Sequence, residues 1–134
     1  MVHSRRGFES MVGYLADYER VIEIGIGRRT DLARALAERG VSVTATDVYD
    51  RDVPVEVQFV RDDVVDPDSS IYADADAVYA RNLPPELHRP ALAVARDADA
   101  DLLFTTLGGD QPTIPVERKP IRTGTLYIAR ARRK

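Results

Sequence analysis

The stretch that decides the fold covers residues 21–47 and reads VIEIGIGRRTDLARALAERGVSVTATD. It begins with Val21-Ile22-Glu23-Ile24, a run rich in β-branched residues that Gly25 closes. A buried strand of a parallel sheet has this composition, because helices cover both of its faces. The sequence therefore predicts a first strand at residues 21–24, with Glu23 as its one ionisable residue.

The pattern becomes helical after the glycine turn. Apolar residues recur at helical spacing from Thr30 onwards, Thr30 or Asp31 can cap the start, and Gly40 can end the helix. A second strand then runs from Val41 to Asp47. Strand, turn, helix and strand in so short a span predict a right-handed βαβ crossover, and hence a parallel sheet.

Strands and helices continue to alternate on both sides of this unit. Phe8, Val12 and Leu15 predict a preceding helix, and the glycines and prolines from Gly108 to Pro120 predict an irregular connection. The sequence further predicts strands at Val55 to Val60, Ala75 to Ala80 and Asp101 to Thr106, and a last strand at Thr125 to Ala131. It predicts one helix between them, at Pro85 to Ala95. The expected fold class is α/β: a Rossmann-like three-layer sandwich whose mostly parallel sheet has five strands plus one C-terminal strand.

Composition sets limits on the function. The chain has 134 residues, of which 44% are hydrophobic, and this suits one nucleotide-binding domain over residues 1–134. It has no run of about 20 apolar residues and no secretory signal at its start, so we expect a cytoplasmic protein without membrane contact. Because cysteine is absent and His3 and His88 are the two histidines, we expect no metal site.

The candidate ligand chemistry concentrates at the turn Glu23-Ile24-Gly25-Ile26-Gly27. Gly25 and Gly27 let the backbone approach a ligand beside a helix start, where free N–H groups and the positive end of the helix dipole lie. Asp47 follows Gly27 by 20 residues, at a strand end where a carboxylate can accept hydrogen bonds from ribose hydroxyls. The alternative is a tight turn and a solvated aspartate.

This combination resembles the S-adenosylmethionine (SAM) site of class I methyltransferases. That family has an acidic residue two positions before the first glycine, as Glu23 is here, and it holds the methionine end of SAM. Arg29 replaces the third glycine of their E-x-G-x-G-x-G pattern. NAD-binding domains fit less well, because they keep this strand apolar and have a third glycine where this chain has Thr30. A buried carboxylate satisfied by N–H groups of the turn is the alternative for Glu23.

An acidic segment follows the predicted third strand and reads Arg61-Asp62-Asp63-Val64-Val65-Asp66-Pro67. It resembles the methyltransferase segment in which an aspartate accepts a hydrogen bond from the adenine amino group. By its spacing to Asp66 and Pro67, Asp63 matches that aspartate better than Asp62 does. A calcium site is disfavoured because the glycine and terminal glutamate of an EF-hand loop are missing. A solvated turn is the alternative.

The predicted fourth strand leads into Tyr79-Ala80-Arg81-Asn82-Leu83-Pro84-Pro85-Glu86. At this sheet edge methyltransferases hold the methyl acceptor, and those that act on amino groups often have N-P-P followed by an aromatic residue. Leu83 and Glu86 depart from that pattern. Arg81 and Asn82 are the candidate substrate-binding residues. The alternative is a helix start, since proline followed by glutamate suits a first turn.

The whole chain, including this segment, resembles a family of small uncharacterised archaeal proteins with a shortened class I methyltransferase-like Rossmann fold. The resemblance implies SAM as the cofactor, and methyl transfer to an unknown acceptor as an extension, with no catalytic residue assigned. Class I methyltransferases close the sheet with an antiparallel strand pair, of which we expect one strand here. The acceptor side would then be open to water.

Two other functions stay open. The first is an NAD or nucleotide sensor, similar to regulatory domains of ion channels that share the G-x-G, the strand-end aspartate and a run like Asp76-Ala77-Val78. The second is an interaction or RNA-binding subunit, in which basic side chains contact nucleic acid phosphates. The net charge is −3, yet basic residues gather near the C-terminal end at Arg118, Lys119, Arg122, Arg130, Arg132, Arg133 and Lys134.

Overall fold

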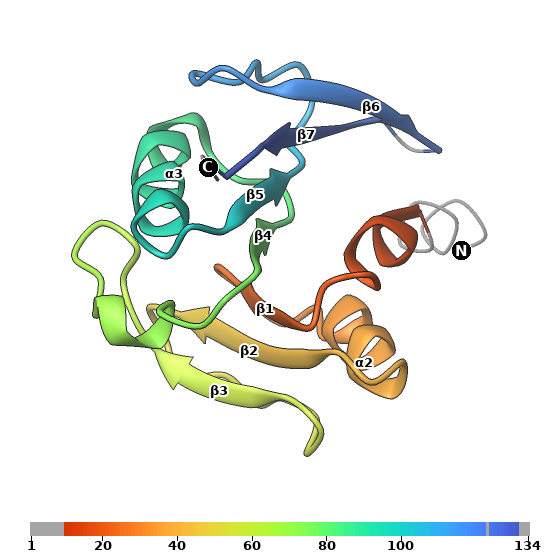
Figure 1. The fold of residues 1–134 in the computed structure, drawn as a ribbon, viewed down its shortest axis with the longest axis vertical. Helices are drawn as coiled ribbons and strands as arrows, with labels where there is room; N and C mark the ends of the chain where they lie inside the picture. Colours follow the sequence, from red (N-terminus) through yellow and green to blue (C-terminus); the bar gives the residue numbers. More distant parts are fainter. Residues whose placement is uncertain (1–9, 123, 132–134) are drawn as a thin grey trace.

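The structure is a computed structural model that describes residues 10–122 and 124–131. Over these residues the chain forms one seven-stranded sheet with helices on both faces (Figure 1). The strands are β1 (Arg20–Glu23), β2 (Ser42–Asp47), β3 (Gln58–Arg61), β4 (Ala77–Ala80), β5 (Asp101–Phe104), β6 (Glu117–Ile121) and β7 (Gly124–Ala129). Residues 10–15 are helical, followed by helices α2 (Asp31–Glu38) and α3 (His88–Asp97) and 3₁₀ turns η1 (Ser69–Ile71) and η2 (Pro85–Leu87).

The strand order is β3-β2-β1-β4-β5-β7-β6. Neighbouring strands from β3 to β5 are parallel, whereas β7 is antiparallel to both β5 and β6. The five parallel strands therefore all end at one edge of the sheet, the carboxyl edge. The strand order reverses between β1 and β4, and open α/β sheets bind their ligands outside the carboxyl edge at such a switch point.

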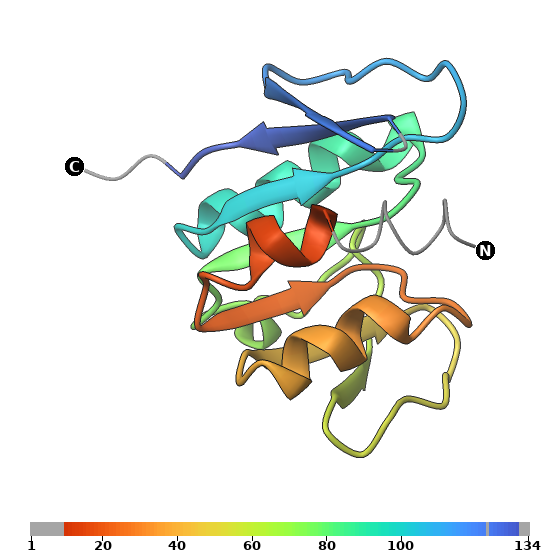
Figure 2. The same ribbon diagram turned by 90° about the vertical axis from the view of Figure 1, so that its right-hand side faces the viewer.

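The sheet lies between two helical layers. Residues 10–15 and α2 cover one face, and α3 covers the other (Figures 1 and 2). On the first face Leu15, Leu32 and Leu36 are fully buried. On the second, Ala91 and Ala95 of α3 are fully buried. These two apolar clusters confirm the predicted three-layer α/β sandwich, because each helix buries one apolar stripe against the sheet.

Helix α2 starts and stops at the predicted residues. Thr30 is the residue before its first turn, but its side chain makes no capping hydrogen bond. At the other end Gly40 has a φ of +90°, its N–H donates to Ala37, and the next N–H, of Val41, donates to Leu36. These two bonds satisfy the last carbonyl groups of the helix, and the left-handed backbone they require favours glycine.

The expectation of one C-terminal strand is wrong, because two strands, β6 and β7, close the sheet. Strand β6 lies largely within the stretch that the glycines and prolines from Gly108 to Pro120 predict to be irregular, and its side chains are mostly exposed. Proline lacks an N–H group and is tolerated at a sheet edge, where one side of the strand has no partner. The antiparallel pair that closes the sheet of class I methyltransferases is therefore present here.

Smaller differences concern the ends of elements. Strand β3 starts at Gln58 rather than Val55, which is 97% exposed in the preceding loop. The predicted helix from Pro85 to Ala95 begins as the 3₁₀ turn η2 and becomes α-helical at His88. The predicted N-terminal helix is present at residues 10–15, while its expected first residue, Phe8, lies outside the described residues.

Candidate functional site

The glycine turn leaves β1 at the carboxyl edge. Gly25 and Gly27 have φ angles of +66° and +58°, in the left-handed region that favours glycine. Ile26 between them is buried, and its N–H donates to the Thr46 carbonyl at 3.0 Å. A Cβ added to either glycine would meet no heavy atom within 4 Å. The outer surface of the turn is therefore open to a ligand.

Asp47 ends β2 and binds the turn directly. Its Oδ2 accepts a hydrogen bond from the Gly27 N–H at 2.9 Å, and its Oδ1 accepts one from the Tyr49 N–H at 3.0 Å. Burial opposes ionisation, but these N–H groups and Arg51, whose Nε lies 3.4 Å from Oδ2, hold the pKa of Asp47 below its usual value. Asp47 is thus an ionised and buried carboxylate beside the turn, not a solvated strand end.

Glu23 lies buried at the end of β1, just before the turn. The register of β1 and β4 places it opposite Tyr79, whose hydroxyl donates to its Oε1 at 2.8 Å. Burial raises the pKa of Glu23 from 4.5 to about 7, although the nearby Arg81 charge and the Tyr79 hydrogen bond act to lower it. The hydrogen-bond partner of the buried Glu23 carboxyl group is therefore the Tyr79 hydroxyl, and not the N–H groups of the turn that the structural alternative predicts.

Arg81 crosses from the end of β4 to the start of α2. Its Nη2 donates to the Arg29 carbonyl at 3.0 Å and to Asp31 Oδ1 at 2.7 Å. Its Nη1 is buried and has no hydrogen-bond partner within residues 10–122 and 124–131. The next residue, Asn82, has a φ of +54°, and its N–H donates to Thr105 Oγ1 at 2.9 Å. An unusual backbone and an unpaired buried donor thus occur side by side, as they often do at functional sites.

A small cavity of about 450 Å³ lies beyond Asp47, lined by Val48, Arg61, Asp62 and Asp63. Both carboxylate oxygens of Asp62 are engaged, one by the Tyr72 hydroxyl and one by the Asp68 N–H, each at 3.0 Å. Asp63 accepts one hydrogen bond, from the Val65 N–H at 3.0 Å. Asp63 therefore has more capacity for a ligand than Asp62. Among the described residues, no group of three metal-binding side chains converges here or elsewhere.

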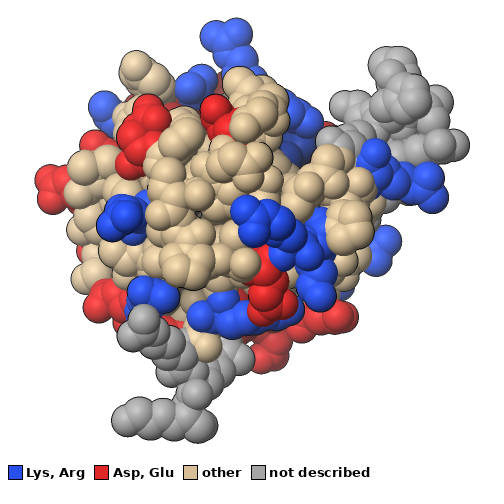
Figure 3. Space-filling view, turned by 90° about the horizontal axis from the view of Figure 1, so that it is seen from above, with Lys and Arg blue, Asp and Glu red and all other residues tan. Residues whose placement is uncertain are grey.

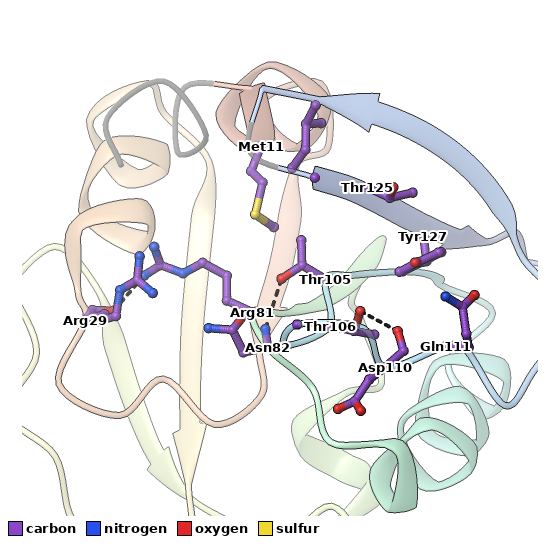
Figure 4. A pocket seen from close by; sticks show the side chains of 13 residues that line it. Met11, Arg29, Arg81, Asn82, Thr105, Thr106, Asp110, Gln111, Thr125 and Tyr127 are labelled. Atoms are coloured by element: carbon purple, nitrogen blue, oxygen red, sulfur yellow. Dashed lines mark hydrogen bonds between the residues drawn. The ribbon is translucent and has the colours of Figure 1, made fainter. Parts of the chain in front are cut away.

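A larger pocket of about 650 Å³ lies at the carboxyl ends of β4 and β5 (Figure 4). Its walls include Arg29 from the glycine turn, Arg81 and Asn82 after β4, Thr105 and Thr106 after β5, and Ile121, Thr125 and Tyr127 from the β6–β7 pair. The structure thus brings both candidate substrate-binding residues to one pocket. The expectation that this side of the sheet lacks a wall is wrong, because the β6–β7 pair lines the pocket.

His88 fixes two segments that flank this pocket. It is fully buried, and its Nδ1 accepts a hydrogen bond from the Thr113 N–H at 3.2 Å. Its Nε2 lies 2.9 Å from the Leu83 carbonyl, which can only accept, so Nε2 carries the proton and donates. The neutral ring therefore ties the segment after β4 to the loop after β5.

We expect the His88→Phe variant to unfold with a free energy about 2 kcal/mol lower than wild type, since it leaves the Thr113 N–H and the Leu83 carbonyl unpaired. Chemical denaturation at neutral pH measures this difference. The His88→Gln variant should lose less, because its amide can both donate and accept. Equal stability of all three proteins would show that the ring makes no structural contribution.

Three residues that contact the candidate site residues Glu23, Arg81 and Asp47 were not predicted: Tyr79, Asp31 and Arg51. Arg51 stands four residues after Asp47, but this spacing pairs side chains on a helix and not in the loop that follows β2. Tyr79 reaches Glu23 through the strand register, and Asp31 reaches Arg81 across 50 residues of sequence. Neither pairing has a local pattern, so a sequence gives no signal for them.

The basic C-terminal end is described in part, since residues 132–134 lie outside the described ranges. Arg130 pairs with Glu117 at 3.0 Å and with Asp101 at 3.7 Å. Over the β6–β7 side of the molecule, acidic and neutral side chains separate the basic ones (Figure 3). The described part of the end therefore presents interrupted positive charge. No helix in the described ranges has the length and apolar character needed to cross a membrane.

Sequence comparison finds archaeal relatives along most of the chain. The model of the uncharacterised protein family UPF0146 matches residues 8–132. A UPF0146 protein of Halobacterium salinarum is 50% identical over 122 residues, which cover 90% of this chain and 95% of the relative. One from Archaeoglobus fulgidus is 43% identical over 99 residues, which cover 72% of this chain and 76% of the relative.

Structural comparison finds methyltransferases. One match is the 1,6-didemethyltoxoflavin-N1-methyltransferase of Burkholderia thailandensis, with bound 1,6-didemethyltoxoflavin and S-adenosylhomocysteine (SAH). The TM-score is 0.58 and the sequence identity 20%, and the match covers 97% of this chain and 62% of the methyltransferase chain. Another match is the MycE methyltransferase of mycinamycin biosynthesis, in complex with Mg and SAH. The TM-score is 0.61 and the sequence identity 14%, and the match covers 98% of this chain and 48% of the MycE chain.

A structure from Rhodobacter sphaeroides assigned to the zinc-dependent alcohol dehydrogenases also matches, with a TM-score of 0.59 and 19% identity over 79% of this chain and 48% of its own. This chain spans between about half and two thirds of the length of these three proteins. The similarities confirm the expected methyltransferase-like Rossmann fold.

Proposed function

Because this chain belongs to the UPF0146 family and has a methyltransferase-like Rossmann fold, we propose that it binds SAM at the carboxyl edge of its sheet. The observation that carries the proposal is the open glycine turn with the ionised Asp47 beside it. The glycine turn, the start of α2 and a fixed carboxylate then lie together at the carboxyl edge, where an adenosine ligand binds in folds of this kind.

In the proposed complex, each part of SAM meets a different residue along this edge. Asp47 accepts hydrogen bonds from the ribose hydroxyls, and Asp63 accepts one from the adenine amino group in the cavity beside Val48. Glu23 lies on the side of the methionine end. A ligand ammonium group would favour its ionised form, which burial now disfavours.

Methyl transfer is a further step of the same proposal. Bound SAM supplies an activated methyl group, and the larger pocket beside the turn would hold the acceptor. Catalysis then depends mainly on positioning the acceptor atom in line with the sulfonium group. The β6–β7 pair supports this step, because it forms one wall of the pocket against which an acceptor can be positioned. None of the residues is assigned as a catalytic acid or base.

An NAD or nucleotide sensor remains the second candidate, favoured by the similarity to the alcohol dehydrogenase fold. Against it stand Glu23, which is an acid on a strand that dinucleotide sites keep apolar, and Thr30, which replaces their third glycine. The two candidates differ in ligand, so one set of binding measurements separates them.

We expect the Asp47→Ala variant to bind SAH at least about tenfold more weakly than wild type, because charge-assisted hydrogen bonds to ribose are worth about 1.5–3 kcal/mol. Calorimetric titration measures the dissociation constants, with circular dichroism as the check on folding. The matched control is Asp50→Ala, an exposed aspartate three positions further on, which should leave the affinity unchanged. Equal affinity of Asp47→Ala and wild type would remove Asp47 from the ribose site.

A further inference from the structure

The larger pocket has a chemical character that the proposed SAM site does not explain. Its volume of about 650 Å³ suits a small molecule. Among the described residues that line it are two arginines, Arg29 and Arg81, and one acidic residue, Asp110. Figure 4 shows side chains from both strand ends and the strand pair around this space, with the Arg81 side chain extending from the end of β4 toward Arg29.

Arg81 is the unusual member of the wall. Its side chain is 10% exposed, and Asp31 and the Arg29 carbonyl both engage Nη2, which leaves the buried Nη1 without a partner. A guanidinium group can donate five hydrogen bonds in a planar fork that suits carboxylate and phosphate groups. If the side chain turns Nη1 toward the pocket, a negatively charged ligand there would supply the acceptor that this atom lacks.

The opposite side of the pocket is partly apolar. Met11, Ile121 and the aromatic ring of Tyr127 form this part of the wall, and Thr105 and Thr106 add hydroxyl groups between the two sides. A ligand that carries an anionic group and an apolar part can therefore meet a matching side chain at each end of the pocket.

We propose that this pocket binds a small organic anion with an apolar part, and that Arg81 selects its anionic group. As a ligand of the pocket, this anion is independent of the SAM proposal. As the methyl acceptor, it rests on the proposed function, because the pocket lies beside the glycine turn. The substrate class would then be small organic acids or phosphate esters, and not nucleic acid or protein.

The test uses benzoate and benzamide, which have nearly the same shape and differ in charge. Both are titrated into the isotope-labelled full chain while amide resonances are followed by two-dimensional NMR. We expect benzoate to shift resonances of residues 105–111 and 124–127, and to bind at least about tenfold more tightly than benzamide. The Arg81→Gln variant should lose this preference, and the control Arg20→Gln, at the opposite edge of the sheet, should keep it.

Two results would overturn the proposal: equal binding of benzoate and benzamide to wild type, or benzoate shifts confined to other parts of the chain. The benzamide comparison decides the matter even if Arg81→Gln fails to fold. A separate titration with SAH reads the resonances of Gly25, Gly27 and Asp63. Benzoate binding without SAH binding would support the anion pocket and contradict the proposed function. SAH binding without benzoate binding would support the proposed function and contradict the anion pocket.

Discussion

Raising the pH from 5 to 8.5 should lower the unfolding free energy of the wild-type protein by about 2–3 kcal/mol more than that of the Glu23→Gln variant. The reason is the raised pKa of Glu23, about 7 in the folded protein against 4.5 as its usual value. The folded state therefore binds this proton more tightly than the unfolded state. The stabilisation is fully present below about pH 4.5 and is lost as the pH rises through about 7.

Chemical denaturation of both proteins across this pH range measures the effect. Other titrating groups are common to the two proteins, so the difference between their curves isolates Glu23. The control Glu19→Gln removes an exposed glutamate and should keep the wild-type pH dependence. Parallel curves for wild type and Glu23→Gln would show that Glu23 ionises at its usual pKa, and would remove the buried acid from the account.

Binding of SAH to the Gly27→Val variant should be at least about 100-fold weaker than to wild type. Valine is disfavoured at a φ of +58°, and its branched side chain would occupy the open surface where the ligand must meet the backbone. The backbone cost would also lower stability, so the titration needs protein shown to be folded by circular dichroism.

Gly40→Val is the matched control for this experiment. Gly40 has a φ of +90° and open space around it, but it lies at the far end of α2 from the glycine turn. Its replacement should cost stability in the same way and leave SAH affinity unchanged. Undiminished affinity of a folded Gly27→Val protein would exclude the turn from the ligand site.

The sequence predicted the central fold because its signals there are local. Residues 21–47 contain two strands rich in β-branched residues, the glycine turn and the helix end at Gly40. Each of these signals acts on the backbone nearby. Strand β6 carries no such signal. It is an exposed edge strand with Pro120 inside it, so neither apolar alternation nor strand composition marks it.

The candidate site was predictable to the extent that residues at strand ends meet at one edge. Asp47 and the glycine turn belong to this class, and they lie in direct contact. The contacts of Glu23 with Tyr79 and of Arg81 with Asp31 depend on strand register and on side-chain reach across the sheet. These properties are set by the packed structure, and no short-range pattern in the chain encodes them.

The central claim is that the chain binds SAM, and the change in melting temperature on adding ligand tests it most directly. At about 100 times its dissociation constant, a ligand adds about 2.7 kcal/mol of stability, which corresponds to roughly 2–8 °C for a domain of this size. We expect SAM and SAH to raise the melting temperature by this amount, and NAD, NADH and ATP to leave it unchanged. A rise with NAD and none with SAM or SAH would contradict the claim.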